Sequence, residues 1–361
     1  MCNENMVSVI IVNYYSAELT AQAVMSIFED DQSVQIVVID NSADEKEHAR
    51  LKTKLPPQVE CIASLDNIGF GSACNLGLER CKYEYIFLLN PDTKIITGCI
   101  SKLKQALVAD QRLGAVSPQS FLDKELKFFL PPGQLQTPKW ELLNTLGYKW
   151  EWYGKKRSQW FRRYSLSVIL SQSPIEQDMI SGAHLMLSKK TIEKLGYLFD
   201  ENFFLYYEDT DLNLRIRKLG LGLSLVPEAK AIHFWRNDPA KAKFATESRR
   251  IYMKKHFPNS WLLILKKIFD SLAMAPIRDY IDLGSISETP RFKVEDELEK
   301  QWVLEISPYP FFIPSVIKVG SGRECVVPHD ILELLGSGEF WARIGKANKI
   351  YQVYKWSYRD K

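Results

Sequence analysis

The chain has 361 residues, of which 46% are hydrophobic and 25% charged, a composition typical of a globular protein with an ample core. Its formal net charge of +3 is too small to indicate a nucleic-acid partner. The N-terminal apolar run is too short for a signal peptide, and no run approaches the 18 apolar residues of a membrane span. The six cysteines show no CxxC spacing, which favours reduced thiols and a cytoplasmic location.

The first 120 residues alternate between strand-like and helix-like runs. Apolar runs rich in β-branched residues predict strands at 7–13, 34–39, 59–63, 85–89 and 115–117. Between them, apolar residues at helical spacing predict helices at 17–28, 72–81 and 100–109. This alternation predicts an α/β fold with a mostly parallel central sheet, in which ligands bind at the carboxyl ends of the strands.

Residues 121–175 interrupt the alternation. The segment is rich in tryptophan and carries a basic cluster from Lys155 to Arg163, which predicts an insertion. One interpretation is ordinary aromatic packing under a long loop with solvated arginines. Another is contact with an anionic lipid-linked acceptor at a membrane face, helped by the amphipathic segment 261–269.

Regular elements return after the insertion. The pattern predicts regular structure over 177–187, a helix over 189–195, a helix through Leu212 to Leu219, and a strand over 223–235. Beyond residue 275, short β-like runs lie between turns that contain proline and glycine. We therefore divide the chain into a domain of residues 1–274 and a small C-terminal domain of residues 275–361, which could serve as a dimer surface.

Polar residues follow the predicted strands. Asp40 ends the second strand, where it could accept a hydrogen bond from the N3–H of a pyrimidine base or simply form a turn. The loop 67–71 leads into a helix whose N-terminus favours an anion, although a left-handed turn explains its glycines equally well.

The fourth strand stops at Asn90-Pro91-Asp92. Pro91 cannot donate to the sheet, and the residue before a proline stays extended, so Asp92 is presented beyond the strand end. A carboxylate there could bind Mg²⁺ or Mn²⁺ that bridges to phosphate, or it could solvate a turn. His233, at the end of the last strand, could complete such a metal shell, although a lone histidine is more often structural.

Three acids, Glu208, Asp209 and Asp211, stand at the start of a predicted helix. Acids stabilise a helix N-terminus, but three within four residues exceed the need of one cap. The aromatic residues just before them would raise the pKa of a carboxylate, which suits a general base.

Six motifs taken together resemble glycosyltransferase family 2, and most of all its bacterial rhamnosyltransferase-like branch, over residues 7 to about 236. They are VSVIIVNYYSAE, VVIDNS, DNIGFGSACNLGL, FLLNPDT, SGAHLMLSKKTIEKLGYLFDENFFLYYEDTDLNLRIRKLG and VPEAKAIHFW. The resemblance implies a nucleotide-sugar-binding fold of the GT-A type and an inverting mechanism.

The resemblance also implies roles for single residues. The nucleotide-binding positions are Asn13, Asp40, Asn67, Gly69, Asn75 and Asn90. Asn90-Pro91-Asp92 occupies the DxD position with Asn in place of the first Asp, which leaves Asp92 as the main ligand of Mn²⁺ or Mg²⁺ and His233 as a second candidate. Asp209 matches the catalytic base, and Glu208 is its partner in the catalytic pair.

The implied reaction moves a sugar, such as rhamnose, from a UDP- or dTDP-sugar to a hydroxyl of a saccharide or lipid-linked acceptor. This would serve cell-surface polysaccharide synthesis, with contact to the inner face of the cell membrane. Two alternatives stay open: a non-catalytic nucleotide-sugar-binding subunit and a nucleotidyltransferase. The second is expected to follow its first strand with a basic glycine-rich loop, where this chain has YYSAELT.

Overall fold

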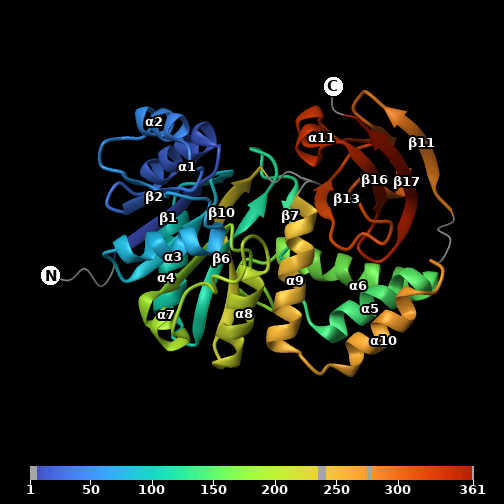
Figure 1. Ribbon diagram of the computed structural model, residues 1–361. Helices are drawn as coiled ribbons and strands as arrows, with labels where there is room; N and C mark the ends of the chain where they lie inside the picture. Colours follow the sequence, from blue (N-terminus) through green and yellow to red (C-terminus); the bar gives the residue numbers. More distant parts are fainter. Residues whose placement is uncertain (1–5, 235–240, 275–278, 360–361) are drawn as a thin grey trace.

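The computed structural model describes residues 6–234, 241–274 and 279–359 and shows two halves joined side by side (Figure 1). The N-terminal half, on the left in Figure 1, is a sheet with helices on both faces. The C-terminal half, in red, is a second group of strands, and a group of helices lies beneath it.

The N-terminal half begins with four parallel strands in the order β3-β2-β1-β4. They are β1 (Val7–Asn13), β2 (Gln35–Asp40), β3 (Glu60–Ala63) and β4 (Tyr85–Leu89). Because Asn13 pairs with Asp40 in the β1–β2 register, the carboxyl ends of these two strands meet at one edge. The four predicted strands are confirmed.

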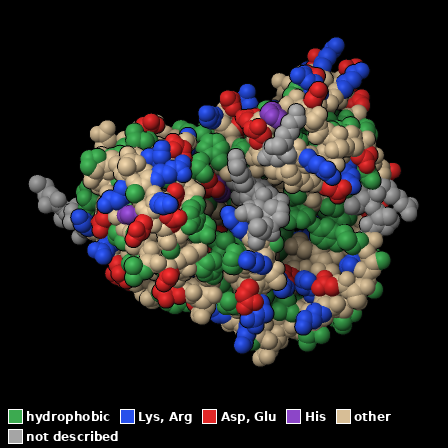
Figure 2. Space-filling view, turned by 45° about the horizontal axis from the view of Figure 1, so that its top comes forward, with side chains coloured by type: hydrophobic (Ala, Val, Ile, Leu, Met, Phe, Trp, Pro, Cys, Tyr) green, Lys and Arg blue, Asp and Glu red, His purple; other side chains and the backbone are tan. Residues whose placement is uncertain are grey.

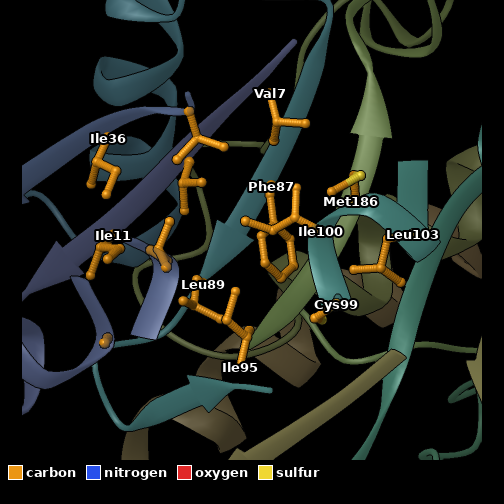
Figure 3. Packing of buried hydrophobic residues seen from close by; sticks show 14 of the residues in the cluster. Val7, Ile11, Ile36, Phe87, Leu89, Ile95, Cys99, Ile100, Leu103 and Met186 are labelled. Atoms are coloured by element: carbon orange, nitrogen blue, oxygen red, sulfur yellow. The ribbon is translucent and has the colours of Figure 1, made fainter. Parts of the chain in front are cut away.

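Both faces of this sheet are buried, because the β-branched residues of its strands alternate between two cores. Val9 and Ile11 of β1 join the core under α1 (Ala17–Asp30), α2 (Glu45–Lys54) and α4 (Cys99–Ala109), part of which Figure 3 shows. Ile10 and Val12 join the core under α3 (Phe70–Arg80), α7 (Lys189–Leu195) and α8 (Glu208–Lys218). The sequence therefore buries the strands on both sides and leaves their ends to bind ligands.

Beyond β4 most strands pair antiparallel. This part contains β5 (Thr93–Ile95), β6 (Leu113–Phe121), β8 (Ile175–Gln177), β9 (His184–Ser188) and β10 (Gly222–His233). Only β6 and β10 are parallel here, so the predicted parallel character belongs to β1–β4 and this pair. The regular structure predicted over 177–187 is interrupted in its middle, because residues 178–183 form a loop that contacts α8.

The insertion is helical, which corrects its interpretation as a long loop. After β7 (Phe129–Leu130), α5 (Pro138–Lys149) and α6 (Glu151–Ile169) pack against each other. Buried residues recur at helical spacing along α6, among them Arg157 and Arg162. The expectation of solvated arginines is therefore wrong for these two, whereas Arg163 is exposed.

The C-terminal half has its own core, to which Leu122 and Phe128 from the insertion contribute. Its strands are β11 (Ile281–Ile286), β12 (Arg291–Lys293), β13 (Trp302–Ser307), β14 (Val316–Gly320), β15 (Glu324–Val326), β16 (Gly338–Gly345) and β17 (Ile350–Tyr358). A short helix, α11 (His329–Leu335), covers them. Ile317 of β14 pairs with Phe129 of β7, so the sheet continues from one half to the other.

Two further helices follow β10. They are α9 (Ala242–His256), which stands between the halves in Figure 1, and α10 (Trp261–Asp270), which packs on α5. Among the described residues, no helix is long and apolar enough to cross a membrane.

Candidate active site

The ends of β1 and β2 form a closed hydrogen-bond network. Asn13 Nδ2 donates to Asp40 Oδ1 over 3.0 Å, and His48 Nδ1 lies 3.1 Å from Asp40 Oδ2. The backbone N–H of Ser42 donates to the same Oδ1, and Asp40 is 2% exposed. Both Asp40 oxygens already accept bonds, so a base N3–H would have to share one of them. The sequence did not identify His48, which lies eight residues further along the chain.

The predicted nucleotide loop is held against the segment that precedes α8. Gly69 has φ +82°, and a Cβ at this position would lie 2.5 Å from the carbonyl oxygen of Phe204. Only glycine fits such a close approach in the left-handed region. Asn67 is exposed, and its Oδ1 accepts from Asn41 Nδ2 over 2.8 Å.

Asn75 lies on α3 and binds protein backbone. Its Nδ2 donates to the carbonyl of Phe199 over 2.9 Å, and its Oδ1 accepts from the N–H of Phe199 over 3.0 Å. Both polar atoms of the side chain are used across 124 residues of sequence. This geometry indicates that Asn75 positions the approach to α8.

The turn after β4 contains buried acceptors without partners. Among the described residues, Asn90 Oδ1, Asp92 Oδ1 and Thr93 Oγ1 are buried and lack a hydrogen bond. Asp92 Oδ1 lies 3.5 Å from Nε2 of His233, which ends β10. Burial alone would raise the pKa of Asp92, but His233 outweighs burial and lowers it, so Asp92 is ionised at neutral pH.

A second histidine, His184, packs beside His233, and no role was predicted for it from the sequence. His184 begins β9, and its Nδ1 and Nε2 bond the hydroxyls of Ser117 and Ser120 at 2.9 and 2.6 Å. Burial and the neighbouring His233 lower the pKa of His184 to about 3, so its ring is neutral. It packs edge to face on His233 with the ring centres 5.6 Å apart. Its position in the motif SGAHLML was the available signal.

The three acids at the start of α8 have different surroundings. Asp211 is fully buried and contacts Arg215, Lys255 and His256 at 2.6–2.7 Å, so it holds α9 against α8. Glu208 Oε2 is buried without a hydrogen-bond partner among the described residues. Burial and then the charge of Asp209 raise the pKa of Glu208 to about 8.

Asp209 accepts two backbone hydrogen bonds and lines a cavity. Its Oδ2 accepts from the N–H of Gly182 over 3.2 Å, and its Oδ1 accepts from the N–H of Thr210 over 2.6 Å. A Cβ at Gly182 would lie 2.9 Å from the Cβ of Asp209, so the loop can come this close only with glycine. Burial raises the pKa of Asp209 against the opposing effect of these N–H groups. The preceding Tyr206 and Tyr207 both have positive φ, a strained turn of the kind that clusters at functional sites.

The cavity has a volume of about 600 Å³ and lies between the two halves. Asp209, His184 and His233 line one wall, and Tyr309 and Pro314 of the C-terminal half line the other. Figure 2 shows the molecule hollowed between its halves, with hydrophobic side chains along the hollow. The structure therefore brings the predicted base and His233 to one cavity, whereas Asp92, Glu208 and Asn75 do not line it.

Asn90, Asp92 and His233, which we call the metal corner, carry polar atoms that fit a divalent cation. Asp92 supplies an ionised carboxylate, His233 an imidazole and Asn90 a buried oxygen without a partner. Hard oxygen donors with one imidazole suit Mn²⁺ or Mg²⁺. Among the described residues no three His, Cys, Asp or Glu side chains cluster as a metal shell, so a cation here would need ligands from substrate or water.

The chain is similar to known sugar-transferring proteins. A hexosyltransferase of low-salt glycan biosynthesis, Agl10 of Haloferax volcanii, is 26% identical over 68% of this chain and 72% of that protein. The N-acetylglucosaminyl-diphospho-decaprenol L-rhamnosyltransferase of Mycobacterium tuberculosis is 26% identical over 56% of this chain and 67% of that protein. The dTDP-rhamnosyl transferase RfbF of Shigella flexneri is 25% identical over 64% of this chain and 69% of that protein.

The family model described as "Glycosyl transferase family 2" matches residues 8–174, which contain β1–β4 and the Asn90-Pro91-Asp92 turn. This match agrees with the α/β architecture and confirms the predicted GT-A type of fold. Residues 8–174 of this chain, just under half of its length, therefore match the glycosyl transferase family 2 domain.

Proposed function

We propose that the protein transfers a hexose-type sugar, with inversion, from a UDP- or dTDP-sugar to a hydroxyl of a saccharide or lipid-linked acceptor. The observation that carries this proposal is the placement of Asp209 in one cavity with His233, the neighbour of Asp92. Names of relatives support the donor and acceptor classes, since one is a dTDP-rhamnosyl transferase and another acts on a diphospho-decaprenol acceptor.

Asp209 acts as the general base. It accepts the proton of the acceptor hydroxyl while that oxygen bonds to the anomeric carbon. The bond from the anomeric carbon to the diphosphate oxygen breaks at the same time, and its electron pair leaves with the nucleoside diphosphate. The raised pKa of Asp209 makes it a stronger base than an exposed aspartate, and the N–H groups of Gly182 and Thr210 hold it in place.

The donor occupies the edge formed by β1, β2 and β4. Asp40 receives the N3–H of the uracil or thymine base, and the loop at Asn67 and Gly69 flanks the nucleotide. Asp92 and His233 would hold Mn²⁺ or Mg²⁺, with Asn90 Oδ1 as a further donor. Such a cation supplies Lewis-acid stabilisation of the charge that develops on the departing diphosphate.

The C-terminal half, which we keep as a separate domain from residue 275, shapes the acceptor side of the cavity. Tyr309 and Pro314 face Asp209 across it. An acceptor that enters between the halves would therefore meet the base from the C-terminal side.

We further propose that α10 rests on the anionic cytoplasmic face of the cell membrane. Trp261, Ile264 and Ile268 lie along α10 and are each more than half exposed. Trp152, from α6, is also exposed, and Lys267 supplies an exposed positive charge beside them. Exposed aromatic and aliphatic residues with flanking lysines are typical of a helix in the plane of a membrane surface.

Vesicle flotation tests the membrane surface. We expect the protein to float with vesicles that contain phosphatidylglycerol, and the triple substitution of Trp261, Ile264 and Ile268 by serine to abolish flotation. Val108→Ser, an exposed apolar residue on α4, is the control and keeps binding. Equal flotation of the triple variant would refute the assignment, and a loss of dimer in its light scattering would assign the face to a second copy.

A transfer assay with Asp209→Asn tests the proposed reaction. We expect its rate to fall by about 10²–10⁴-fold, because general-base catalysis contributes this much, while nucleotide affinity changes little. Asp178→Asn, a matched change at an exposed carboxylate, keeps full activity. Transfer by Asp209→Asn at the wild-type rate would contradict the role of Asp209. Absence of transfer and hydrolysis by the wild type with every donor would favour the binding subunit.

A further inference from the structure

We propose that a second, smaller chamber beside the active-site cavity binds an anionic group of the acceptor, a phosphate or a carboxylate, through Arg157. This inference rests on the proposed function, because it identifies part of the substrate whose hydroxyl faces Asp209.

The chamber lies where the insertion meets the C-terminal half. It has a volume of about 230 Å³ and is lined by α5, α6 and the loop 309–314. At about 30 Å³ for each water, this space holds roughly eight waters and therefore admits a phosphate-sized group. Tyr309 and Pro314 line both this chamber and the main cavity, so the two spaces adjoin.

Arg157 brings an unpaired charge to this chamber. Its side chain is 9% exposed, and its Nη2 is buried without a hydrogen-bond partner among the described residues. The guanidinium stacks on Trp140, with 4.3 Å from its carbon to the ring centre, but forms no ion pair in the described parts of the chain. A buried charge without a partner is unfavourable, and such charges in proteins are normally paired.

Two other arginines at the same interface show the usual arrangement. Arg162 of α6 and Arg343 of β16 are both buried, and both bind the carboxylate of Glu305. Arg343 also binds Ser158. Folding thus pairs these two guanidinium groups with one carboxylate, whereas Arg157, five residues before Arg162 on α6, faces an open space.

The rest of the lining suits an anion. Tyr148 and Tyr309 bring phenol groups and Asn144 brings an amide, and none of the described residues that line the chamber is acidic. Planar guanidinium groups bind phosphate and carboxylate through two parallel hydrogen bonds, and Trp140 holds the guanidinium of Arg157 in place for such a contact. The ligand is therefore an oxyanion, and its place beside Tyr309 connects it to the acceptor in the main cavity.

Binding of inorganic pyrophosphate to the full chain, with EDTA present and no donor, tests the chamber apart from the catalytic reaction. We expect saturable binding by calorimetry, and about a tenfold or greater loss of affinity in Arg157→Met, since a hydrogen bond to a charged group contributes about 1.5–3 kcal/mol. Arg163→Met, an exposed arginine on the same helix, and Asp92→Ala should bind like the wild type. Equal affinity of Arg157→Met would overturn the inference. If that variant does not fold, Tyr309→Phe replaces it, and unchanged affinity has the same meaning.

Kinetics with matched acceptors tests whether the anion belongs to the acceptor. We expect Arg157→Met to raise KM about tenfold for an acceptor saccharide that carries a phosphodiester or carboxylate, with kcat little changed. KM for the same saccharide without the anion should not change. Pyrophosphate binding that depends on Arg157, but without this difference in KM, would show a free anion as the ligand and overturn the assignment to the acceptor. Absence of all transfer by the wild type would instead refute the proposed function and leave the calorimetric result standing.

Discussion

Two regions at the same edge of the sheet differ in how their polar atoms are satisfied. At the ends of β1 and β2, Asn13, Asp40 and His48 bond one another, and Asp40 is almost completely buried. At the turn after β4, Oδ1 of Asn90 and Oδ1 of Asp92 are buried without hydrogen bonds among the described residues. Neighbouring strands of one sheet thus end in two different ways. The ends of β1 and β2 form a closed hydrogen-bond network, and the turn after β4 has buried acceptors without partners among the described residues.

This difference indicates which of the two regions a bound ligand would stabilise more. A closed network is rigid before substrate arrives, so the end of β2 presents a fixed shape to a base. Buried acceptors without partners are unfavourable until something donates to them or coordinates them. The turn after β4 is therefore the region that a cation and a diphosphate would stabilise most. Variants at the two regions should accordingly differ in what they change.

The largest effect in this comparison is expected at the open region. Asp92→Ala removes the ionised carboxylate of the metal corner, so we expect at least about a tenfold loss of donor affinity in the presence of Mn²⁺. Stability without metal should fall slightly, because the contact with His233 that lowers the pKa of Asp92 is lost. Calorimetric titration of the nucleotide with and without Mn²⁺ measures the change.

Asp282→Ala, an exposed aspartate on β11, is the matched control and should leave the titration unchanged. Nucleotide affinity in Asp92→Ala that still rises with Mn²⁺ as in the wild type would show that the cation binds elsewhere.

A smaller effect of another kind is expected at Asn75, which makes only satisfied contacts. Asn75→Ala leaves the N–H and carbonyl of Phe199 without their partners, which costs about 1–3 kcal/mol of unfolding free energy. Because Asn75 binds backbone, nucleotide affinity should fall only through the loosened segment before α8. Urea unfolding and nucleotide titration of the same variant separate the two effects.

Asn67→Ala serves for comparison, since its side chain is exposed on the nucleotide loop. It should change nucleotide affinity more than stability. If Asn75→Ala lost nucleotide affinity with stability unchanged, Asn75 would contact the nucleotide as the sequence predicted.

Asn75 also shows which features a sequence can reveal. The strand ends could be predicted, because runs such as 85–89 stop where Pro91 cannot donate to the sheet. The predicted helix over 189–195 has the observed bounds. The bond from Asn75 to Phe199 joins residues 124 positions apart, and no local pattern predicts it. The same holds for Asp40 and His48, whose pairing depends on how α2 packs beside β2.

The helices of the insertion were not predicted, for a different reason. Its composition directed attention to tryptophans and basic residues, although residues 154, 157, 158, 161 and 162 follow the spacing of one buried helix face. Polar and charged residues at those positions hid the helical pattern of burial, because arginines such as Arg157 and Arg162 are not expected in a protein core. Their burial depends on Glu305 for Arg162 and, in our proposal, on a ligand for Arg157.

The smallest effect is expected at Glu208. This side chain is buried beside Gly71 of α3, and its Oε2 has no hydrogen-bond partner among the described residues. Burial and Asp209 raise its pKa from 4.5 in the unfolded chain to about 8 in the folded one. Between these values the folded state keeps a proton that the unfolded state loses, so the contribution of Glu208 to stability is complete below pH 4.5 and is lost as pH rises towards 8. Glu208→Gln cannot ionise, so it should match the wild type near pH 5 and exceed its unfolding temperature by a few degrees near pH 8. Thermal unfolding across this range measures the difference, with Glu201→Gln as an exposed control that keeps the wild-type slope. Parallel pH profiles for Glu208→Gln and the wild type would mean that Glu208 is ionised at neutral pH, as an open acceptor of the same kind as Asp92.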